Sequence, residues 1–199
     1  EIYNENGFDL LDKKHANIPF DKWNKMNLYE DLNQNFHLKN LSLHQCNSEQ
    51  TAIDLLMMGN YIRRVSSTPM NHASSRSHCV FTIQIEIKDL NTNSVRSSKL
   101  HLIDLAGSER TYKTETDQSM KNEAKYINKS LSYLEQVIVA LAKNEGKKRQ
   151  HVPYRNSMLT SILRDSLGGN CKTVMIATMA MEKQSEEETL STVRFANRC

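Results

Sequence analysis

The residues of this sequence best suited to chemistry are an acid and a glycine three positions apart, Asp104 and Gly107. The mostly apolar run 100–103 leads into Asp104 and is typical of a buried strand, and ligands bind at the carboxyl ends of such strands. A carboxylate at this point can hold a divalent cation. A glycine lets its backbone N–H approach an anion closely because it has no Cβ. The pair predicts a sensor of magnesium-bound phosphate, although the same pair also occurs in ordinary turns.

A second polar cluster, residues 71–78, reads Asn-His-Ala-Ser-Ser-Arg-Ser-His. The segment 79–88 that follows alternates apolar and polar residues, which is the pattern of a half-buried strand. Turn-forming residues 89–94 link it to a second strand over 95–104, and we expect the two strands to pair as an antiparallel hairpin. This hairpin would hold the cluster beside Asp104. In the alternative interpretation, the cluster is a solvated serine-rich loop with no tie to Asp104.

Residues 71–78 and 104–109 resemble the switch I and switch II motifs of kinesin motor domains, both complete and about thirty residues apart. The resemblance runs from the middle of that domain to its last helix and continues through residues 126–131, 151–155, 165–170 and 191–196. Glu135 and Gln136 follow Leu134 where most kinesins have Leu-Gly, so kinesin-9 is the most similar subfamily. The resemblance implies an α/β, P-loop-NTPase-like kinesin motor fold with a mostly parallel central sheet, an antiparallel hairpin and flanking helices.

The resemblance also implies a nucleotide site for ATP and Mg²⁺. Its catalytic residues would be Ser75, Arg76 and Glu109, with Arg76 and Glu109 paired around the attacking water. Its nucleotide-binding residues would be Asn71, Ser74, Ser75, Asp104 and Gly107. Ser75 and Asp104 would hold the metal, because hydroxyl and carboxylate oxygens are the ligands that Mg²⁺ prefers.

Positive charge is concentrated in residues 110–172, where 12 Lys and Arg stand against 6 Asp and Glu, although the whole chain carries only +3. This suits an acidic partner such as tubulin or nucleic acid, and a solvated basic face is the alternative. The resemblance favours microtubules over nucleic acid or membrane, with dimer formation through segments outside this chain. The implied microtubule-binding residues are Lys39, Lys125, Asn128, Lys129, Tyr154 and Arg155. Met158 and Ser161 stand where many kinesins have Lys and Arg, which predicts weaker binding.

Apolar residues at steps of three and four predict helices over 51–65, 122–142, 153–168 and 186–197. In the first, Thr51 is expected to cap the helix. The face expected to be apolar there comprises Ile53, Leu56, Met57 and Tyr61. In the second, the stripe expected to face the core comprises Ile127, Leu131, Leu134, Ile138 and Leu141. The apolar run 173–179 predicts a central strand.

No Gly-Lys-Ser/Thr phosphate loop occurs in the 199 residues. We therefore expect residues 1–199 to be part of a motor domain whose N-terminal phosphate-loop half and neck linker lie outside the chain. The cysteines show no Cys-x-x-Cys spacing, which is typical of a reduced, intracellular protein. The kinesin-9 resemblance implies a cytoskeletal location in the cytoplasm and the ciliary axoneme.

The leading hypothesis is a microtubule motor that couples ATP hydrolysis to movement, with this chain inactive alone for lack of the phosphate loop. A second hypothesis is a non-hydrolysing microtubule-binding or axonemal scaffold that keeps the fold. A third is a GTPase, because Asp-x-x-Gly also marks G proteins. Base recognition there needs Asn-Lys-x-Asp, and residues 24–27 and 128–131 both lack the final acid.

Overall fold

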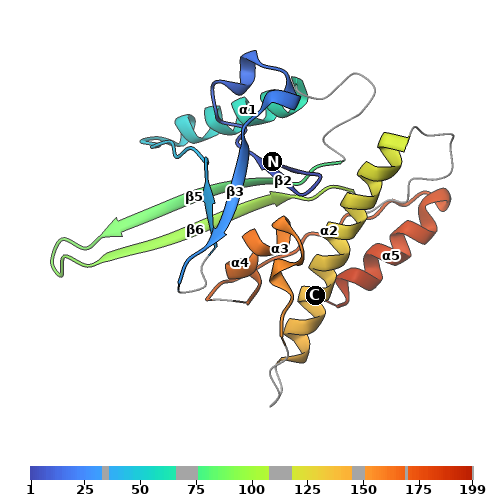
Figure 1. Ribbon diagram of the computed structural model, residues 1–199. Helices are drawn as coiled ribbons and strands as arrows, with labels where there is room; N and C mark the ends of the chain where they lie inside the picture. Colours follow the sequence, from blue (N-terminus) through green and yellow to red (C-terminus); the bar gives the residue numbers. More distant parts are fainter. Residues whose placement is uncertain (33–35, 66–75, 108–117, 145–150, 169, 199) are drawn as a thin grey trace.

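The computed structural model describes residues 1–32, 36–65, 76–107, 118–144, 151–168 and 170–198 (Figure 1). Its helices are α1 (Glu49–Val65), α2 (Gln118–Lys143), α3 (Met158–Ile162), α4 (Arg164–Gly168) and α5 (Glu186–Ala196). Its strands are β1 (Ile2–Tyr3), β2 (Asn6–Phe8), β3 (Lys25–Glu30), β4 (Phe36–Lys39), β5 (Cys79–Lys88) and β6 (Val95–Asp104). Single 3-10 turns cover His15–Asn17, Phe20–Lys22, Tyr154–Asn156 and Lys183–Ser185. None of the helices in these described segments has the length and apolar character needed to cross a membrane.

The strands form two sheets, and every pairing among the described residues is antiparallel. One sheet has the order β1-β2-β3-β4, and the other is the hairpin β5-β6. A single bridge between Ile2 and His78 joins them. The described part of the chain therefore lacks the expected parallel central sheet. The run 173–179 was predicted to be a central strand, but it is extended without a ladder because no described strand lies alongside to receive its hydrogen bonds.

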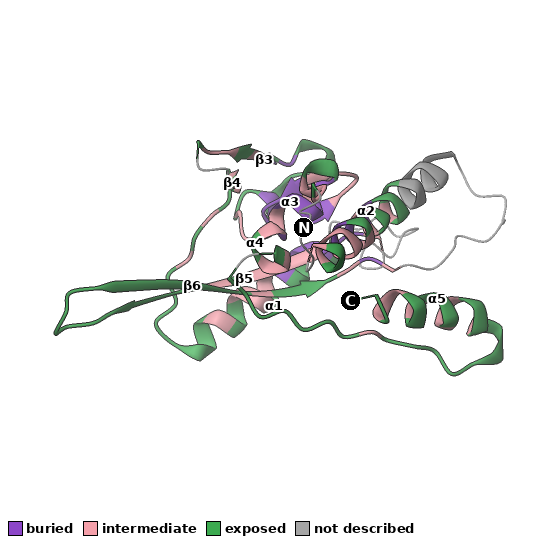
Figure 2. Cartoon of the chain, turned by 90° about the horizontal axis from the view of Figure 1, so that it is seen from below, coloured by how far each residue is buried: buried purple, intermediate pink, exposed green. Residues whose placement is uncertain are grey.

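The hairpin β5-β6 has the predicted register, with Cys79 opposite Asp104 and Lys88 opposite Val95. Strand β6 is not buried as expected, since Leu100 and Leu102 are 49% and 51% exposed. Strand β5 is half-buried, as predicted, only in its first part. The reason is that few of the described residues pack over this two-stranded ribbon beyond its base. Figure 2 shows the outer part of the hairpin, and the extended chain before α5, as mostly exposed.

Helix α2 supplies the centre of the packing. Leu134 contacts a buried cluster formed with Ile2, Leu159 and Leu163. The predicted stripe is confirmed, because all five of its residues are buried or half-buried. Val137 lies among them and is fully buried, although the predicted stripe did not include it.

Helix α1 packs through a different face from the predicted one. Ile62 is buried against Phe8, Leu10 and Trp23, with Met58 beside them. The expected face is instead turned outward, with Ile53, Met57 and Tyr61 39%, 64% and 66% exposed. The predicted cap was also wrong. The Oγ of Ser48 accepts a hydrogen bond from the N–H of Thr51 at 3.2 Å, so the helix begins at Glu49.

The single helix predicted over 153–168 is a 3-10 turn followed by α3 and α4. Ser157 begins α3 with a capping box, because its Oγ accepts from the N–H of Thr160 while the Oγ1 of Thr160 accepts from the N–H of Ser157. Leu163 leaves the helical region, with φ −84° and ψ 0°, and separates α3 from α4. Helix α5 is confirmed as predicted to within one residue.

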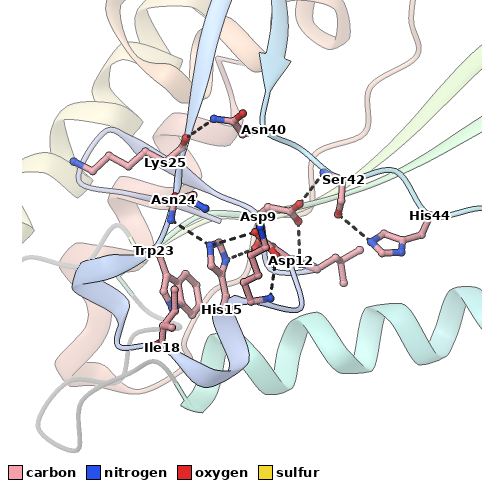
Figure 3. Close-up of polar contacts among 12 residues, drawn as sticks. Asp9, Asp12, His15, Ile18, Trp23, Asn24, Lys25, Asn40, Ser42 and His44 are labelled. Carbon is pink, nitrogen blue, oxygen red and sulfur yellow. Dashed lines mark hydrogen bonds and ion pairs between the residues drawn. The ribbon is translucent and has the colours of Figure 1, made fainter.

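A buried polar cluster around Asp9 joins separate segments of the first 45 residues (Figure 3). The Asp9 carboxylate accepts a 2.7 Å hydrogen bond from the N–H of Ser42, and its carbonyl accepts one from Nδ1 of His15 at 2.7 Å. The Nε2 of His15 accepts from the N–H of Asn24 at 3.2 Å, and the ring stacks on Trp23 at 4.4 Å. These hydrogen bonds hold the segment between β4 and α1 against the loop that follows β2.

Candidate functional site

The hairpin register brings the two motifs together as predicted. Asp104, the last residue of β6, lies opposite Cys79, which directly follows the polar cluster 71–78. Within that cluster, Arg76 is half-buried and Ser77 is fully buried. The motif residues Asn71, Ser74, Ser75 and Glu109 lie outside the described residues. Their contacts with phosphate, metal and Arg76 therefore stay predictions.

Asp104 forms an ion pair with Arg63, a residue that lies outside the predicted motifs. The Nη1 of Arg63 lies 2.8 Å from Oδ2 of Asp104, and its Nη2 donates to the carbonyl of Ser77 at 2.9 Å. The Arg63 side chain is 6% exposed and that of Asp104 is 68% exposed. A buried guanidinium needs such partners, because an unpaired buried charge is costly. Arg63 thus ties the last turn of α1 to both motifs, and the only sequence signal for it was a basic pair just before the cluster.

The exposed carboxylate of Asp104 fits the implied Mg²⁺. One oxygen is engaged by Arg63, and Oδ1 has no protein hydrogen bond among the described residues. An exposed oxygen can reach a metal through water, which Mg²⁺ commonly retains. The described residues contain no cluster of three His, Cys, Asp or Glu that could hold a metal without further ligands. Asp104 would therefore need additional oxygen ligands, and the predicted hydroxyl of Ser75 is of the right type.

Gly107 follows a firmly anchored residue. Ala106 is 4% exposed, and its N–H donates to Nδ1 of His78 at 3.0 Å. Gly107 does not adopt a positive φ, so its backbone conformation is open to other residues. Close approach of an anion to its N–H stays the predicted reason for glycine here.

His78 is buried between the motifs and α2. Its Nε2 lies 2.8 Å from Oγ of Ser130, and its pKa is lowered to about 4, first by burial and then by the charge of Arg63. The ring is therefore neutral at physiological pH. His78 is the last residue of the predicted motif 71–78, and its sequence position alone indicated no role for it.

The predicted filament-binding residues fall on two separate surfaces. On α2, Asn128 and Lys129 are exposed, and the ammonium of Lys129 lies 5.7 Å from the centre of the Tyr133 ring. Lys125 belongs to the same helix, but its side chain lies outside the described set.

The second surface combines β3-β4 with the turn before α3. Arg155 is 68% exposed, and its Nη2 lies 2.8 Å from Glu30. Tyr154 is half-buried, and burial raises the pKa of its phenol. Lys39 is exposed but pairs with Asn27, three register positions from Glu30, so the two cations stand at opposite ends of the β3-β4 ribbon.

Ser161 does not lie on an outer surface, contrary to the expectation for a partner-facing position. It is 3% exposed, and its hydroxyl donates to the carbonyl of Tyr154 at 3.0 Å. Ser161 and Met158 line a groove of about 410 Å³ between β2-β3 and α3. A cation at position 161 would have to extend through this groove to reach a partner.

The chain matches known proteins along its whole length. The sequence profile of the kinesin motor domain matches residues 1–199. The chain is 45% identical to kinesin-like protein KIF9 of Mus musculus and 44% identical to kinesin-like protein KLP1 of Chlamydomonas reinhardtii, over 100% of its own length. It spans 25% of the length of each of these relatives.

Solved kinesin structures also match the chain along almost its whole length. A structure of a fast kinesin superposes with a TM-score of 0.82 at 40% identity, covering 99% of this chain and 52% of that one. A KIF14 dimer solved in complex with a microtubule superposes with a TM-score of 0.85 at 36% identity, covering 99% of this chain and 55% of that one.

Proposed function

The chain belongs to the kinesin motor domain family, and from that premise we propose that it is the nucleotide-sensing and track-binding part of a microtubule motor. The full protein would couple ATP hydrolysis to binding and movement along microtubules. One observation carries this proposal, namely the register that sets Asp104 of switch II opposite Cys79, which directly follows switch I. Two switch segments can respond to the same phosphate only when they are adjacent.

In this proposal, the described end of the nucleotide site is built on Asp104 and Gly107. Asp104, fixed on one oxygen by Arg63, would hold Mg²⁺ together with Ser75. The bound metal would neutralise charge on the phosphates. The N–H of Gly107 would bind the terminal phosphate and lose that contact after hydrolysis.

The remaining switch residues would complete the site. Asn71 and Ser74 would line the phosphates as hydrogen-bond donors. Arg76 and Glu109 would pair and close the site around the attacking water. Glu109 would thus act in hydrolysis and contribute little to nucleotide affinity.

The proposed partner is the microtubule. Lys125, Asn128 and Lys129 on α2 would make the main contact, and the net positive charge of residues 110–172 suits an acidic filament. Lys39, Tyr154 and Arg155 would add a second contact. The pair between Arg155 and Glu30 should weaken that contact, because the cation is already partly neutralised. The kinesin-9 similarity supports a cytoskeletal location that includes the ciliary axoneme.

The proposal is tested by ATP turnover of the full-length protein with and without microtubules. Microtubules should stimulate turnover, and Glu109→Ala should abolish hydrolysis while retaining nucleotide binding. Arg76→Ala should behave alike, and the double variant should be no worse than either single one because the two residues act as a unit. Glu86→Ala, which removes an exposed carboxylate from β5, is the matched control.

The outcomes separate the motor from its rival. Microtubule binding without ATP turnover would identify the non-hydrolysing scaffold. Multiplicative losses in the double variant would show that Arg76 and Glu109 are not paired.

A further inference from the structure

His78 contacts two segments that the proposed motor must move in concert. Its Nδ1 accepts from the N–H of Ala106 at 3.0 Å, and its Nε2 lies 2.8 Å from Oγ of Ser130. Ala106 precedes Gly107, the proposed phosphate contact. Ser130 is one residue from Lys129, on the helix proposed to bind the filament. One imidazole therefore spans the distance between the nucleotide-sensing segment and α2.

The hydrogen-bond directions follow from the partners. The hydroxyl of Ser130 donates to the carbonyl of Ile127 at 2.8 Å, so its oxygen accepts from Nε2–H of His78. The backbone N–H of Ala106 can only donate, so Nδ1 carries no proton. These requirements are met by the neutral imidazole alone, in a single tautomer. The lowered pKa of His78 agrees with this state.

The backbone of His78 is fixed independently of both partners. Its N–H donates to the carbonyl of Ile2 at 3.0 Å, and its carbonyl accepts from the N–H of Ile2 at 2.8 Å. The preceding residue, Ser77, is held by Arg63. The imidazole therefore projects from an anchored position. If Ala106 moves, either α2 moves with it or one of the two hydrogen bonds of the imidazole, to Ala106 or to Ser130, must break.

We propose that His78 is a positioning residue that couples the segment 104–107 to α2, so that a change at Gly107 alters the microtubule-binding face of α2. The inference rests on the proposed motor function. It identifies the residue that links the nucleotide-sensing segment to the helix proposed to bind the filament. His78 need not touch nucleotide or filament.

Two substitutions at His78 each retain one of its hydrogen bonds. In His78→Asn the shorter amide lies near the position of Nδ1 and can still accept from Ala106. In His78→Gln the amide reaches the position of Nε2 and can still donate to Ser130. Ser130→Ala removes the partner on α2. Ser132→Ala removes an exposed serine from the same helix and is the matched control.

The measurement is microtubule affinity of the full-length protein by co-sedimentation, with a non-hydrolysable ATP analogue and with ADP. The ratio of the two dissociation constants reports the coupling between sites. We expect this ratio to fall at least about fivefold in His78→Asn, His78→Gln and Ser130→Ala. The control should keep the ratio of the parent protein, and His78→Asn combined with Ser130→Ala should lose no more than the worse single variant.

Thermal unfolding of the same variants excludes a merely structural effect. Loss of coupling with unchanged unfolding midpoints supports the inference. An unchanged ratio of dissociation constants in His78→Asn and Ser130→Ala overturns the inference. A loss of coupling that grows in proportion to the fall in the thermal unfolding midpoint, from variant to variant, also overturns it. A parent protein with equal affinity in both nucleotide states would overturn the proposed motor function, and this inference with it.

Discussion

The middle of helix α2 and the base of the hairpin β5-β6 meet at the buried residue His78, but the two elements differ along their lengths. On α2, Leu134 is 5% exposed because Leu159 of α3 and Ile2 of β1 pack against it, and Val137 is fully buried. On the hairpin, Leu102 is 51% exposed, and only the residues next to the base are packed. The difference shows that an apolar face becomes a core only where another element covers it.

The largest expected difference between the two regions is in packing energy. In the 199-residue chain, Leu159→Ala should lower the free energy of unfolding by about 3–4 kcal/mol, because Leu159 is fully buried. Leu102→Ala should cost less than about 1 kcal/mol. Urea unfolding followed by far-UV circular dichroism measures both. Equal losses would contradict the comparison, whereas a larger cost for Leu102→Ala in the full-length protein would show that further residues cover the hairpin there.

Low pH should destabilise the packed region around His78. The pKa of His78 is about 4 in the fold and about 6.5 when unfolded. As the pH falls below 6.5, the unfolded chain takes up the proton first, so stability should decline until about pH 4 and then level off. The expected loss from this group is about 3 kcal/mol.

The pH effect can be assigned by substitution. His78→Asn should flatten the decline in stability between pH 6.5 and 4. His101→Asn, on the exposed hairpin, should leave most of it. A decline of the same size in the His78→Asn variant would show that other groups dominate.

The uncovered region should drive self-association of the 199-residue chain. The hairpin and the extended chain before α5 expose apolar side chains, including Leu102 at 51% and Ile176 at 86%. Light scattering after size exclusion should detect oligomers, and Leu102→Lys with Ile176→Lys should reduce them. A parent chain that elutes as a monomer would contradict this expectation.

The smallest effect concerns the filament. Charge reversal at Lys125 or Lys129 of α2 should weaken microtubule binding several-fold, and more steeply as the salt concentration falls. Lys99→Glu, on the hairpin, is the control and should bind like the parent protein. Co-sedimentation at several salt concentrations measures this. If reversal at both α2 lysines leaves binding unchanged, this helix is not the filament contact.

The local patterns that predicted the fold correctly are those whose signal lies within one segment. The periodicity of α2 and the turn between the strands of the hairpin are of this kind, and the hairpin register followed from the length of the two runs. The wrong face of α1 shows the limit. Its apolar residues occur on two sides, and the choice between them depends on Phe8 and Trp23, which are distant in sequence.

The candidate site, like the fold, could be predicted from the sequence only in part. Its motifs gave the neighbourhood of Asp104, but Arg63 could not be recognised, because an arginine in the last turn of a helix is equally well explained by the helix dipole. The failure at 173–179 has a related cause. An apolar run can form a strand only when a partner strand is present, and its own sequence does not provide one.

The packing of Trp23 determines what one common experiment can observe. It is the single tryptophan of the chain, 6% exposed and stacked on His15 beside α1. Its fluorescence will therefore report the environment of the α1 contact. Opening of α5, or of the hairpin beyond its base at Cys79, would leave the emission spectrum nearly unchanged. A single fluorescence transition would therefore describe one part of this molecule only.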